Sequence, residues 1–454
     1  MREPLLTAAE MRAAEAGHDV AELMERAGRA VAECVLERYG EARRIAVVCG
    51  GGANGGDGRI AARVLRHAGR DAAETTDVAE ADLVVDALFG TGFAGLPRPE
   101  AAALIEAVNG CGRPVVAVDV PSGVDASTGE VPGAAVRAAL TVTFHAQKVG
   151  LAVAPGRFHA GEVVVADIGL GESDARHGLV THAVLELVPL RSAESTKYTA
   201  GSVLVVGGSR GLSGAICLSA EAAFRADAGY VAVAVPGSIL PVVEQRLLEA
   251  VKRPCPEDED GRLVEAAADV VLELAERATA VALGPGLGRG TGAAALVQRL
   301  LRELELPVVV DADALFGLEP SERSASTVLT PHAGELGRLL GAESSWVSAQ
   351  RLEALERAVE RFGCTVLLKG ADTLVGAPGE EVLVCPSDSP GLATAGSGDV
   401  LTGIVAAFLA KGLEGSLAAA AAATAHSLAA SLAPTQAGMV ASDVVALLPL
   451  ALAR

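Results

Sequence analysis

The chain has 454 residues, of which 50% are hydrophobic and only 3% aromatic, and its formal net charge at pH 7 is −20. This length is sufficient for two ordinary domains with cores of Ala, Val and Leu. The negative charge argues against nucleic acid or an anionic membrane surface as the main partner, so an anionic ligand must be bound by glycine loops, helix ends and a few cations.

The cysteine pattern and the N-terminal residues predict a cytoplasmic protein. The seven cysteines are an odd number, and none forms a C-x-x-C pair. The first residues carry charges and no apolar run, so we expect no signal peptide. The alanine-rich segment 416–433 predicts a buried helix rather than a membrane span, because it contains His426 and several hydroxyl side chains.

The first elements of the chain are a predicted helix, a strand, a glycine loop and a second helix. Asp19 and Glu22 have the spacing of a capping box at the start of the first helix. Residues 44–49 form a continuous apolar run, which predicts a buried strand. A glycine-rich loop at 50–58 follows, and then a helix to about residue 68.

Further strands of parallel type are predicted at residues 83–86, 114–119, 140–144 and 163–168. Several of these strands end in loops rich in glycine, aspartate or serine. In an open α/β sheet the carboxyl ends of the strands share one edge, so we expect the polar residues at these ends to converge. They are Asn54, Asp57, Asp86, Asp119 and Ser122. A simple capping role is the alternative for any single aspartate.

A looser, polar segment from residue 171 to 199 separates the two halves and predicts domains of residues 1–193 and 194–454. In the second half, apolar strands are predicted at 202–206, 231–235, 280–283, 307–310, 327–329 and 365–368. Their alternation with amphipathic helices predicts a second doubly wound α/β domain.

The segment 391–408 is a glycine-rich loop that leads into a helix. Backbone N–H groups at such a helix start form an anion site. Asp399 at this position suits a base that takes a proton from a substrate hydroxyl while the loop holds the charge on a phosphoryl group. The alternative is an ordinary aspartate N-cap after a glycine turn.

His332 and Lys369 are further candidates, because each follows a predicted strand at the same sheet edge as Asp311. His332 is either a ligand contact or an ordinary turn histidine. Lys369 is either a phosphate contact or a strand-end lysine that reaches water. The sequence contains no G-x-x-x-x-G-K-[ST] or G-x-S-x-G motif, and His332 has no metal-ligand spacing.

Together these residues resemble the bifunctional NAD(P)H-hydrate repair enzymes over nearly the whole chain. Residues 52–58, Gly-Ala-Asn-Gly-Gly-Asp-Gly, are similar to the G-N-N-G-G-D-G loop of the epimerase domains, except that Ala53 replaces the first Asn. Segments 22–28, 86–92 and 118–123 match as well. The resemblance implies a Rossmann-like three-layer sandwich for the first half, with a reduced sheet around residues 70–81.

The same resemblance implies roles for the residues of the first half. A potassium ion would be bound by the oxygen-bearing side chains of Asn54, Asp86 and Ser122, which suit a hard cation. Asp119 is the candidate for proton transfer during epimerisation. The implied substrate contacts are Asn54, Gly55, Gly56, Asp57, Gly90, Thr91, Gly92, Phe93, Ala94, Gly95, Leu96 and Asp119.

The second half resembles the ADP-dependent NAD(P)H-hydrate dehydratases, which have a ribokinase-like fold. The matching segments, in order, are 207–209, 213–215, 284–288, 330–335 and 396–399. A small departure is Tyr198, which follows Lys197 where the family commonly has glycine. The implied substrate contacts are Ala215, Gly286, His332 and the catalytic Asp399. The implied nucleotide contacts are Lys369, Gly370, Ala371, Asp372, Thr373 and Gly398.

The resemblance implies epimerisation of R- and S-NAD(P)HX and nucleotide-dependent dehydration of the S form to NAD(P)H, with release of AMP and phosphate when ADP is used. Potassium, magnesium and ADP or ATP are the implied ions and co-substrates. We expect small-molecule substrates and a homo-oligomer, with neither nucleic acid nor a membrane as partner.

Two other functions are compatible with parts of the sequence. The first is a kinase for a small vitamin precursor, because Gly-Ser-Gly-Asp at 396–399 occurs across ribokinase-like proteins. The epimerase-like first half argues against a kinase. The second is a nucleotide sensor without enzymatic activity, which the retained polar loop residues disfavour.

Overall fold

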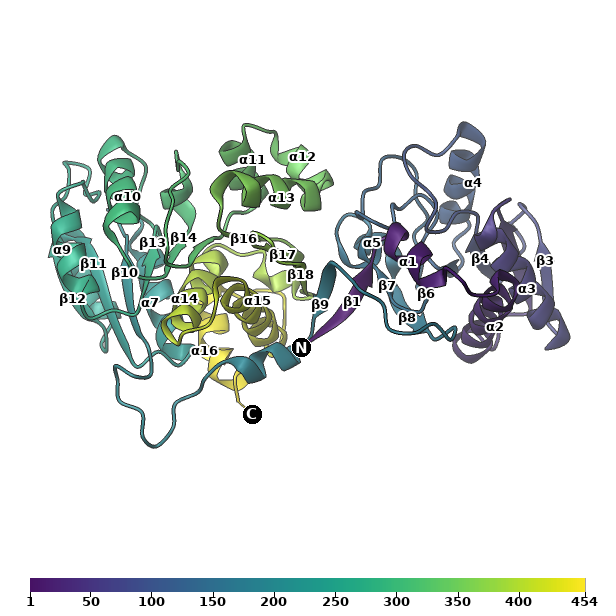
Figure 1. The fold of residues 1–454 in the computed structure, drawn as a ribbon, viewed down its shortest axis with the longest axis horizontal. Coiled ribbons are helices and arrows are strands. Elements are labelled where there is room, and N and C mark those ends of the chain that lie inside the picture. The colour runs from purple at the N-terminus through teal and green to yellow at the C-terminus, as the bar shows by residue number, and fades with distance from the viewer. Residues whose placement is uncertain (454) are drawn as a thin grey trace. The chain divides into compact units, whose positions relative to one another are not determined.

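The structure is a computed structural model that describes residues 1–453, and the chain forms two compact units. The N-terminal unit comprises Pro4–Leu179 and Ser348–Arg351. The C-terminal unit comprises Met1–Glu3, Val180–Val347 and the chain from Leu352 onward. Each unit contains parallel strands and a buried core, and many of its elements are labelled in Figure 1.

The sheet of the N-terminal unit has six parallel strands. They are β2 (Arg44–Cys49), β3 (Asp71–Glu74), β4 (Leu83–Ala87), β5 (Val115–Val118), β6 (Leu140–Phe144) and β8 (Glu162–Ala166). Their order across the sheet is β3-β2-β4-β5-β6-β8. The predicted strands of the first half are confirmed, and the segment around 70–81 contributes only the short edge strand β3.

Helices cover both faces of this sheet. Successive side chains of a strand point to opposite faces, so each strand contributes to two cores. Val47 and Val85 share one core with α2 (Val20–Arg38) and α3 (Ala53–His67). Val48 and Val84 share a second core with α4 (Pro99–Gly110). The unit is therefore the three-layer sandwich that the sequence predicted.

The start of α2 follows the prediction only in part. The Asp19 side chain accepts hydrogen bonds from the amides of Ala21 at 2.8 Å and Glu22 at 3.4 Å, as expected of an N-cap. The Glu22 side chain does not complete a capping box. It pairs instead with Arg26 one turn later, at the spacing that favours opposite charges on a helix.

The glycine loop predicted at 50–58 is shorter than expected, because α3 already begins at Ala53. The glycines of this segment serve close packing as well as turning. A Cβ atom on Gly55 would lie 1.9 Å from the carbonyl oxygen of Gly50. Part of the glycine-rich segment that predicted a flexible loop is therefore a helix, and its glycines allow this helix to pack closely against neighbouring segments.

Short elements complete the first half of the chain. Leu5 and Leu6 of β1 (Arg2–Leu6) pair in parallel with β7 (Gln147–Lys148). The remaining elements are α1 (Ala8–Glu15), α5 (Val149–Ala152), α6 (Arg157–Ala160) and β9 (His177–Val180).

In the C-terminal unit, the strands predicted from the sequence are confirmed. They are β10 (Ser202–Val206), β11 (Tyr230–Pro236), β13 (Ala280–Leu283), β14 (Val308–Val310), β15 (Thr327–Leu329) and β16 (Thr365–Leu368). Three strands were not predicted, β12 (Val251–Cys255), β17 (Asp372–Gly376) and β18 (Val382–Pro386). The order is β12-β11-β10-β13-β14-β15-β16-β17-β18, parallel through β16 and antiparallel for β17 and β18.

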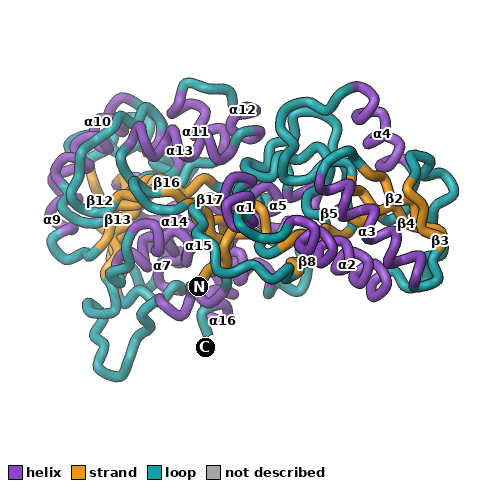
Figure 2. The backbone as a smooth tube through the Cα atoms, turned by 45° about the vertical axis from the view of Figure 1, so that its right-hand side comes forward, coloured by secondary structure: helices purple, strands orange, loops and turns teal. Residues whose placement is uncertain are grey.

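Helices lie on both faces of this sheet as well (Figure 2). The α-helices of the second half are α7 (Ser213–Arg225), α8 (Leu240–Arg246), α9 (Ala267–Ala275), α10 (Thr291–Glu303), α11 (Ala333–Leu340), α12 (Ser344–Ala349), α13 (Arg351–Phe362), α14 (Ser397–Ala410), α15 (Gly415–Ser431) and α16 (Ala441–Ala451). The 3-10 helices are η1 (His182–Leu187), η2 (Gly237–Ile239), η3 (Ala312–Leu315) and η4 (Pro390–Leu392).

Helix α14 is the central helix of the C-terminal core. Every residue from Val400 to Ala410 is buried, and the helix packs against α7 and α15. Helix α15, the alanine-rich segment, is also largely buried, as predicted. None of the helices in residues 1–453 has the length and apolar character needed to cross a membrane.

The segment before β10 packs with the C-terminal unit, although the sequence predicted a domain boundary after residue 193. Val180, Val184 and Val188 are each buried in the core that also contains α14 and α15. The division into 1–193 and 194–454 stays a prediction for separated pieces in solution. The three buried valines favour a cut before Val180.

We predict that a piece comprising residues 180–454 is more stable than one comprising 194–454. The longer piece retains three buried valines, and full burial of such a side chain contributes about 1.5–3 kcal/mol. Urea unfolding of both pieces measures the difference. As a control within the longer piece, Val184→Ala should destabilise more than Leu187→Ala, since Leu187 is exposed. Equal stability of the two pieces would contradict the prediction.

Candidate active sites

The predicted polar residues of the N-terminal unit lie at the carboxyl end of its parallel strands. Asp86 is within β4, Asp119 follows β5 directly, and Asn54 lies in the first turn of α3, after β2. Ser122 lies in the turn beyond Asp119. The predicted convergence on one edge of the sheet is therefore present in the fold.

Asp86, Ser122 and Asn54 are joined by hydrogen bonds around Phe89. The Ser122 hydroxyl donates to Asp86 Oδ1 at 2.6 Å, and the Ser122 amide donates to Asp86 Oδ2 at 2.8 Å. The Phe89 amide donates to Ser122 Oγ at 2.8 Å. Asn54 Nδ2 donates to the Phe89 carbonyl at 2.8 Å. The three residues predicted to bind a cation thus meet at one place.

The carboxyl group of Asp86 is buried without a cationic partner. Burial raises its pKa to about 6, against the opposing effect of the hydrogen bonds from Ser122 and Leu88. Within residues 1–453, no lysine, arginine or histidine lies within ion-pair distance of Asp86. The site therefore contains buried oxygen atoms and an uncompensated negative charge.

Asp119 has a different environment at the same edge. Its backbone adopts the left-handed conformation, with φ of 65°, and its side chain is buried. The Thr143 hydroxyl donates to Asp119 Oδ1 at 3.0 Å, and Lys148 Nζ lies 2.7 Å from the same oxygen. Oδ1 of Asp119 is therefore bound by residues of two neighbouring segments, Thr143 of β6 and Lys148 of β7.

Two further acids lie near Asp119. Burial raises the pKa of Asp57 to about 8, and the charges of Asp119 and Glu15 add to this effect. Burial also raises the pKa of Glu15, again reinforced by Asp119. This edge therefore brings together several carboxyl groups, two of them with a raised pKa, an arrangement suited to proton transfer.

The loop predicted to contact the substrate begins beside Asn54. A Cβ on Gly90 would lie 3.0 Å from the Asn54 amide, so the loop backbone passes directly over it. The Phe93 ring stacks on Phe89 with 4.9 Å between centroids. Leu96 ends the loop with 73% of its surface exposed, which leaves an apolar side chain open to a ligand or to solvent. Gly56 of α3 packs against Met24 of α2.

In the C-terminal unit, Asp399 lies in the first turn of α14. The N-cap of this helix is Gly396, in the left-handed conformation with φ of 88°, so no side chain caps the helix. Asp399 is the third helical residue rather than the N-cap that the sequence left as an alternative. The first amides of the helix, including that of Gly398, are thus available to an anion.

The carboxyl group of Asp399 has an environment suited to a base near neutral pH. Burial raises its pKa to about 7, Asp311 raises it further, and the Lys369 ammonium opposes the shift. Asp313 and Glu335 add smaller effects that also raise the pKa. A carboxylate with this pKa can accept a proton at neutral pH and return it.

Lys369 lies between Asp311, at the end of β14, and Gly398, at the start of α14. Its ammonium lies 2.8 Å from Asp311 Oδ1, and a Cβ on Gly398 would lie 3.3 Å from the same nitrogen. The Thr402 hydroxyl donates to Asp311 Oδ2 at 2.5 Å. Burial opposes the charge on Lys369, but Asp311 and Glu335 outweigh it and raise the pKa. Lys369 is thus a retained cation at the start of α14.

His332 is the N-cap of α11. Its Nδ1 accepts from the amides of Gly334 at 3.0 Å and Glu335 at 3.3 Å, while the Glu335 carboxylate accepts from the His332 amide at 2.9 Å. His332 Nε2 remains on the open side, 3.5 Å from Glu335 Oε1. His332 therefore has a structural role as a helix cap, which the sequence left open as an alternative. Capping uses Nδ1 and leaves Nε2 for a ligand.

The other predicted residues of the second half lie on neighbouring loops. A Cβ on Gly286 would lie 3.1 Å from Ala215 Cβ, so these two substrate candidates are adjacent. Gly370 and Ala371 form the turn after Lys369, but Asp372 and Thr373 already belong to β17. The implied nucleotide contacts at 369–373 are therefore divided between a turn and the start of β17.

Several residues of both sites were not singled out from the sequence. Lys148, Thr143 and Glu15 lie near Asp119. The only sequence signal of Thr143 and Lys148 is polar or charged character at an otherwise apolar strand end, and Glu15 is the last residue of α1. Thr402 lies inside the apolar run of α14, and nothing in the sequence indicates its bond to Asp311. His426 is buried beneath α14 with a hydrogen bond to the Ser397 backbone.

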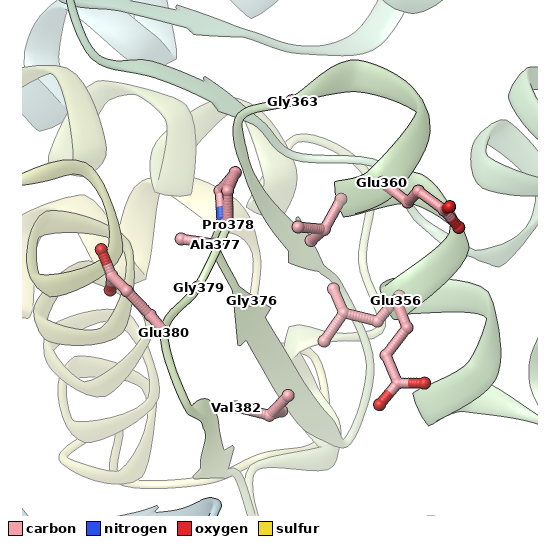
Figure 3. A pocket seen from close by; sticks show the side chains of 11 residues that line it. Glu356, Glu360, Gly363, Gly376, Ala377, Pro378, Gly379, Glu380 and Val382 are labelled. Carbon is pink, nitrogen blue, oxygen red and sulfur yellow. The ribbon is translucent and has the colours of Figure 1, made fainter.

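A separate hollow lies between α13 and the β17–β18 hairpin (Figure 3). Its volume is about 390 Å³, and Glu356, Glu360 and Glu380 are among its lining residues. None of the predicted site residues lines it, so it is distinct from the site around Asp399.

Comparison with protein families assigns both halves of the chain. The family described as NAD(P)H-hydrate dehydratase matches residues 203–449. The family described as YjeF-related protein N-terminus matches residues 20–74 and 67–150. The range matched by the dehydratase family contains the glycine loop before α14 and Asp399. The ranges matched by the YjeF-related family contain the cluster of Asn54, Asp86 and Ser122.

Individual relatives match over nearly the whole length. A bifunctional NAD(P)H-hydrate repair enzyme of Moorella thermoacetica is 38% identical, covering 95% of this chain and 92% of the relative. The enzyme of the same name from Coxiella burnetii is 38% identical over 91% of this chain and 90% of its own. The crystal structure of the ADP/ATP-dependent NAD(P)H-hydrate dehydratase of Bacillus subtilis, co-crystallised with ATP and Mg²⁺, covers 60% of this chain and 96% of its own at 27% identity, with a TM-score of 0.53.

Proposed function

The chain belongs to the family of bifunctional NAD(P)H-hydrate repair enzymes, and we propose that it returns hydrated NADH and NADPH to the active cofactors in two reactions. The N-terminal unit interconverts the R and S forms of NAD(P)HX. The C-terminal unit dehydrates the S form with ADP or ATP as co-substrate. The observation that carries the proposal is Asp399, a base of raised pKa in the first turn of α14 beside the glycine loop.

In the dehydration, Asp399 takes the proton from the hydroxyl group on the reduced nicotinamide ring. The resulting oxygen attacks the terminal phosphorus of the nucleotide, and a new O–P bond forms while the bond to the leaving nucleotide breaks. With ADP, AMP leaves. The amides of Gly396 to Gly398 stabilise the charge on the phosphoryl group, and Lys369 adds a positive charge beside them.

The phosphate ester is then eliminated from the ring. The C–O bond breaks with release of phosphate, the neighbouring ring carbon loses a proton, and the double bond of NADH or NADPH is restored. The same initial steps in a kinase would leave a stable phosphorylated product. Product analysis with the S form and ADP therefore tests the proposal: phosphate and NADH support it, and an accumulating phosphate ester would overturn it.

In the epimerisation, Asp119 takes the proton from the hydroxyl group at the hydrated carbon. A carbonyl group forms there as the bond from that carbon to the ring nitrogen breaks, and the ring closes again on the other face of the carbonyl with return of the proton. The Asp119 carboxylate is buried and bonded to Thr143. The other proposed substrate contacts are Asn54, Gly55, Gly56 and Asp57 at the start of α3. Ala53 replaces the family asparagine, so the side chain at that position makes no polar contact.

Potassium fits the oxygen cluster of Asn54, Asp86 and Ser122. The cluster offers a carboxylate, a hydroxyl and nearby carbonyl oxygen, and the buried charge of Asp86 has no cationic side chain near it in residues 1–453. A hard cation is suited to such oxygen ligands. When bound, it would neutralise Asp86 and orient the Phe89 carbonyl and the loop that follows.

Magnesium accompanies the nucleotide in the dehydration, as it does the ATP of the Bacillus subtilis crystals. Mg²⁺ is commonly bound through the phosphates and water with few protein ligands. Lys369, Gly370, Ala371, Asp372, Thr373 and Gly398 are the proposed contacts of the nucleotide. A homo-oligomer and a cytoplasmic location stay predictions, which sedimentation and fractionation of cells test.

We predict that epimerisation by the wild-type protein is faster in potassium than in choline chloride, and that Asp86→Asn loses this difference. The substitution removes the negative charge that a cation would compensate. Chromatography of the R and S forms at equal ionic strength measures the rates. Asp71→Asn, at an exposed edge strand, should keep the difference. Equal wild-type rates in the two salts would overturn the potassium assignment.

We predict that Asp399→Asn abolishes dehydration and leaves epimerisation intact. The loss of a general base costs about 10²–10⁴-fold in rate. Thermal unfolding at pH 8 should be unchanged or shifted upward, because the variant no longer buries a carboxylate whose pKa is raised. Asp443→Asn, at the same third position of α16, is the matched control and should keep both activities. Dehydration at the parent rate would contradict the role of Asp399.

We predict that kcat/KM of dehydration decreases below about pH 7. The pKa of Asp399 is raised to about 7, and only its deprotonated form accepts the substrate proton, so activity is lost as pH falls through this value. The recovery of NADH from the S form between pH 5 and 9 is the measurement. A rate that stays constant down to pH 5, as an aspartate with the ordinary pKa of about 3.9 would give, would contradict the prediction.

A further inference from the structure

Lys148 is the most deeply buried charged residue beside the epimerase site. Its side chain is completely inaccessible to solvent, and its ammonium lies 2.7 Å from Asp119 Oδ1. It also donates to the Thr143 hydroxyl at 3.0 Å and to the Phe144 carbonyl at 2.8 Å. Two neutral oxygens and one carboxylate therefore satisfy the three donors of the ammonium group.

The local sequence brings this lysine to Asp119 through the sheet. Strands β5 and β6 are neighbours, and Val118 is paired with Val142. Asp119 therefore emerges next to Thr143, at the end of β6. The chain then turns at His145, which has a left-handed φ of 66°, and returns Lys148 to the same point through β7.

The charges around Asp119 are unbalanced without Lys148. The charge of Asp119 raises the pKa of two other acids, Glu15 of α1 and Asp57 of α3. On the β6–β7 side, Lys148 is the cation, and the nearby His145 has a pKa lowered by burial and by Lys148. Lys148 is therefore a positive charge that acts on both Asp119 and Glu15, and Arg12 also acts on Glu15.

We propose that Lys148 is the positioning residue of the epimerase site, which holds Oδ1 of Asp119 and places a positive charge beside that carboxylate while Oδ2 exchanges the proton with the substrate hydroxyl. This inference rests on the proposed epimerase function. During the exchange the substrate O–H bond breaks and its proton moves to Oδ2 of Asp119, while a carbonyl group forms and the bond from the hydrated carbon to the ring nitrogen breaks. Closure of the ring on the other face of the carbonyl returns the proton from Asp119 and gives the other epimer. The Thr143 hydroxyl, which is bonded to both Asp119 and Lys148, orients the pair.

A buried ion pair can also be purely structural, since removal of one partner leaves an unpaired buried charge and destabilises a protein whatever its function. The two roles differ in their pH dependence. A purely structural pair changes the fraction of folded protein, which thermal unfolding at each pH measures separately from the rate. A positioning lysine also changes the pH profile of the rate of the folded enzyme, because an adjacent cation favours the charged form of a carboxyl group by about 1–3 pH units.

The experiment compares Lys148→Met with the wild-type protein and with Lys411→Met. Lys411 is the matched control, because it is also buried and pairs with an aspartate, Asp227, at 2.9 Å in the C-terminal unit. The R and S forms of NADHX are separated by chromatography, and their interconversion is followed without nucleotide from pH 5.5 to 9. Wild-type epimerisation above the buffer rate tests the proposed function itself, separately from the role of Lys148.

We expect the acid limb of kcat/KM for epimerisation to move upward by about one to three pH units in Lys148→Met, with activity recovering as pH rises. Lys411→Met should change thermal stability and leave this limb in place. Thr143→Val, which removes one bond to each partner but no charge, should move it in the same direction by less.

Dehydration of the S form with ADP reports whether the variant chains are folded and should be retained in Lys148→Met. If Lys148→Met does not fold, Thr143→Val decides the question alone. An unmoved acid limb in the folded variants, or an equal shift in Lys411→Met, would overturn the inference.

Discussion

Both sites depend on the burial of carboxyl groups at the carboxyl ends of parallel strands. Asp86 and Asp119 occupy these ends in the N-terminal unit, and Asp311 occupies one in the C-terminal unit. A carboxylate removed from water is costly unless it gains hydrogen bonds, a cation or a proton. The neighbouring residues of each site are arranged to supply one of these three, and this is how the fold generates acids and bases that function near neutral pH.

The two units solve this problem in a similar way. In each, one lysine pairs with a strand-end aspartate, Lys148 with Asp119 at 2.7 Å and Lys369 with Asp311 at 2.8 Å. A further carboxyl group nearby keeps a raised pKa, about 8 for Asp57 and about 7 for Asp399. The chain has a net charge of −20, so these few local cations, with the helix amides, determine where a phosphorylated substrate can bind.

The strands and the edges at which they end could be predicted because apolar runs and the polar residues that follow them are local signals. The convergence of the polar strand-end residues, Asn54, Asp86 and Ser122 among them, followed from this rule, and their grouping as a cation site followed from the family resemblance. The pairing of Lys369 with Asp311 could not be predicted, because it joins residues 58 positions apart through the packing of the sheet. The start of α3 within a glycine segment was missed because composition does not distinguish a flexible loop from close helix packing.

The central claim is that one chain carries both reactions in sequence. The most direct test supplies the purified R form of NADHX together with ADP and follows NADH, AMP and phosphate. The account predicts that NADH forms beyond the rate set by spontaneous epimerisation, in equal amounts with AMP and phosphate, and that omission of ADP leaves a mixture of R and S forms. NADH formation limited to the spontaneous rate, or phosphate release without NADH, would contradict it.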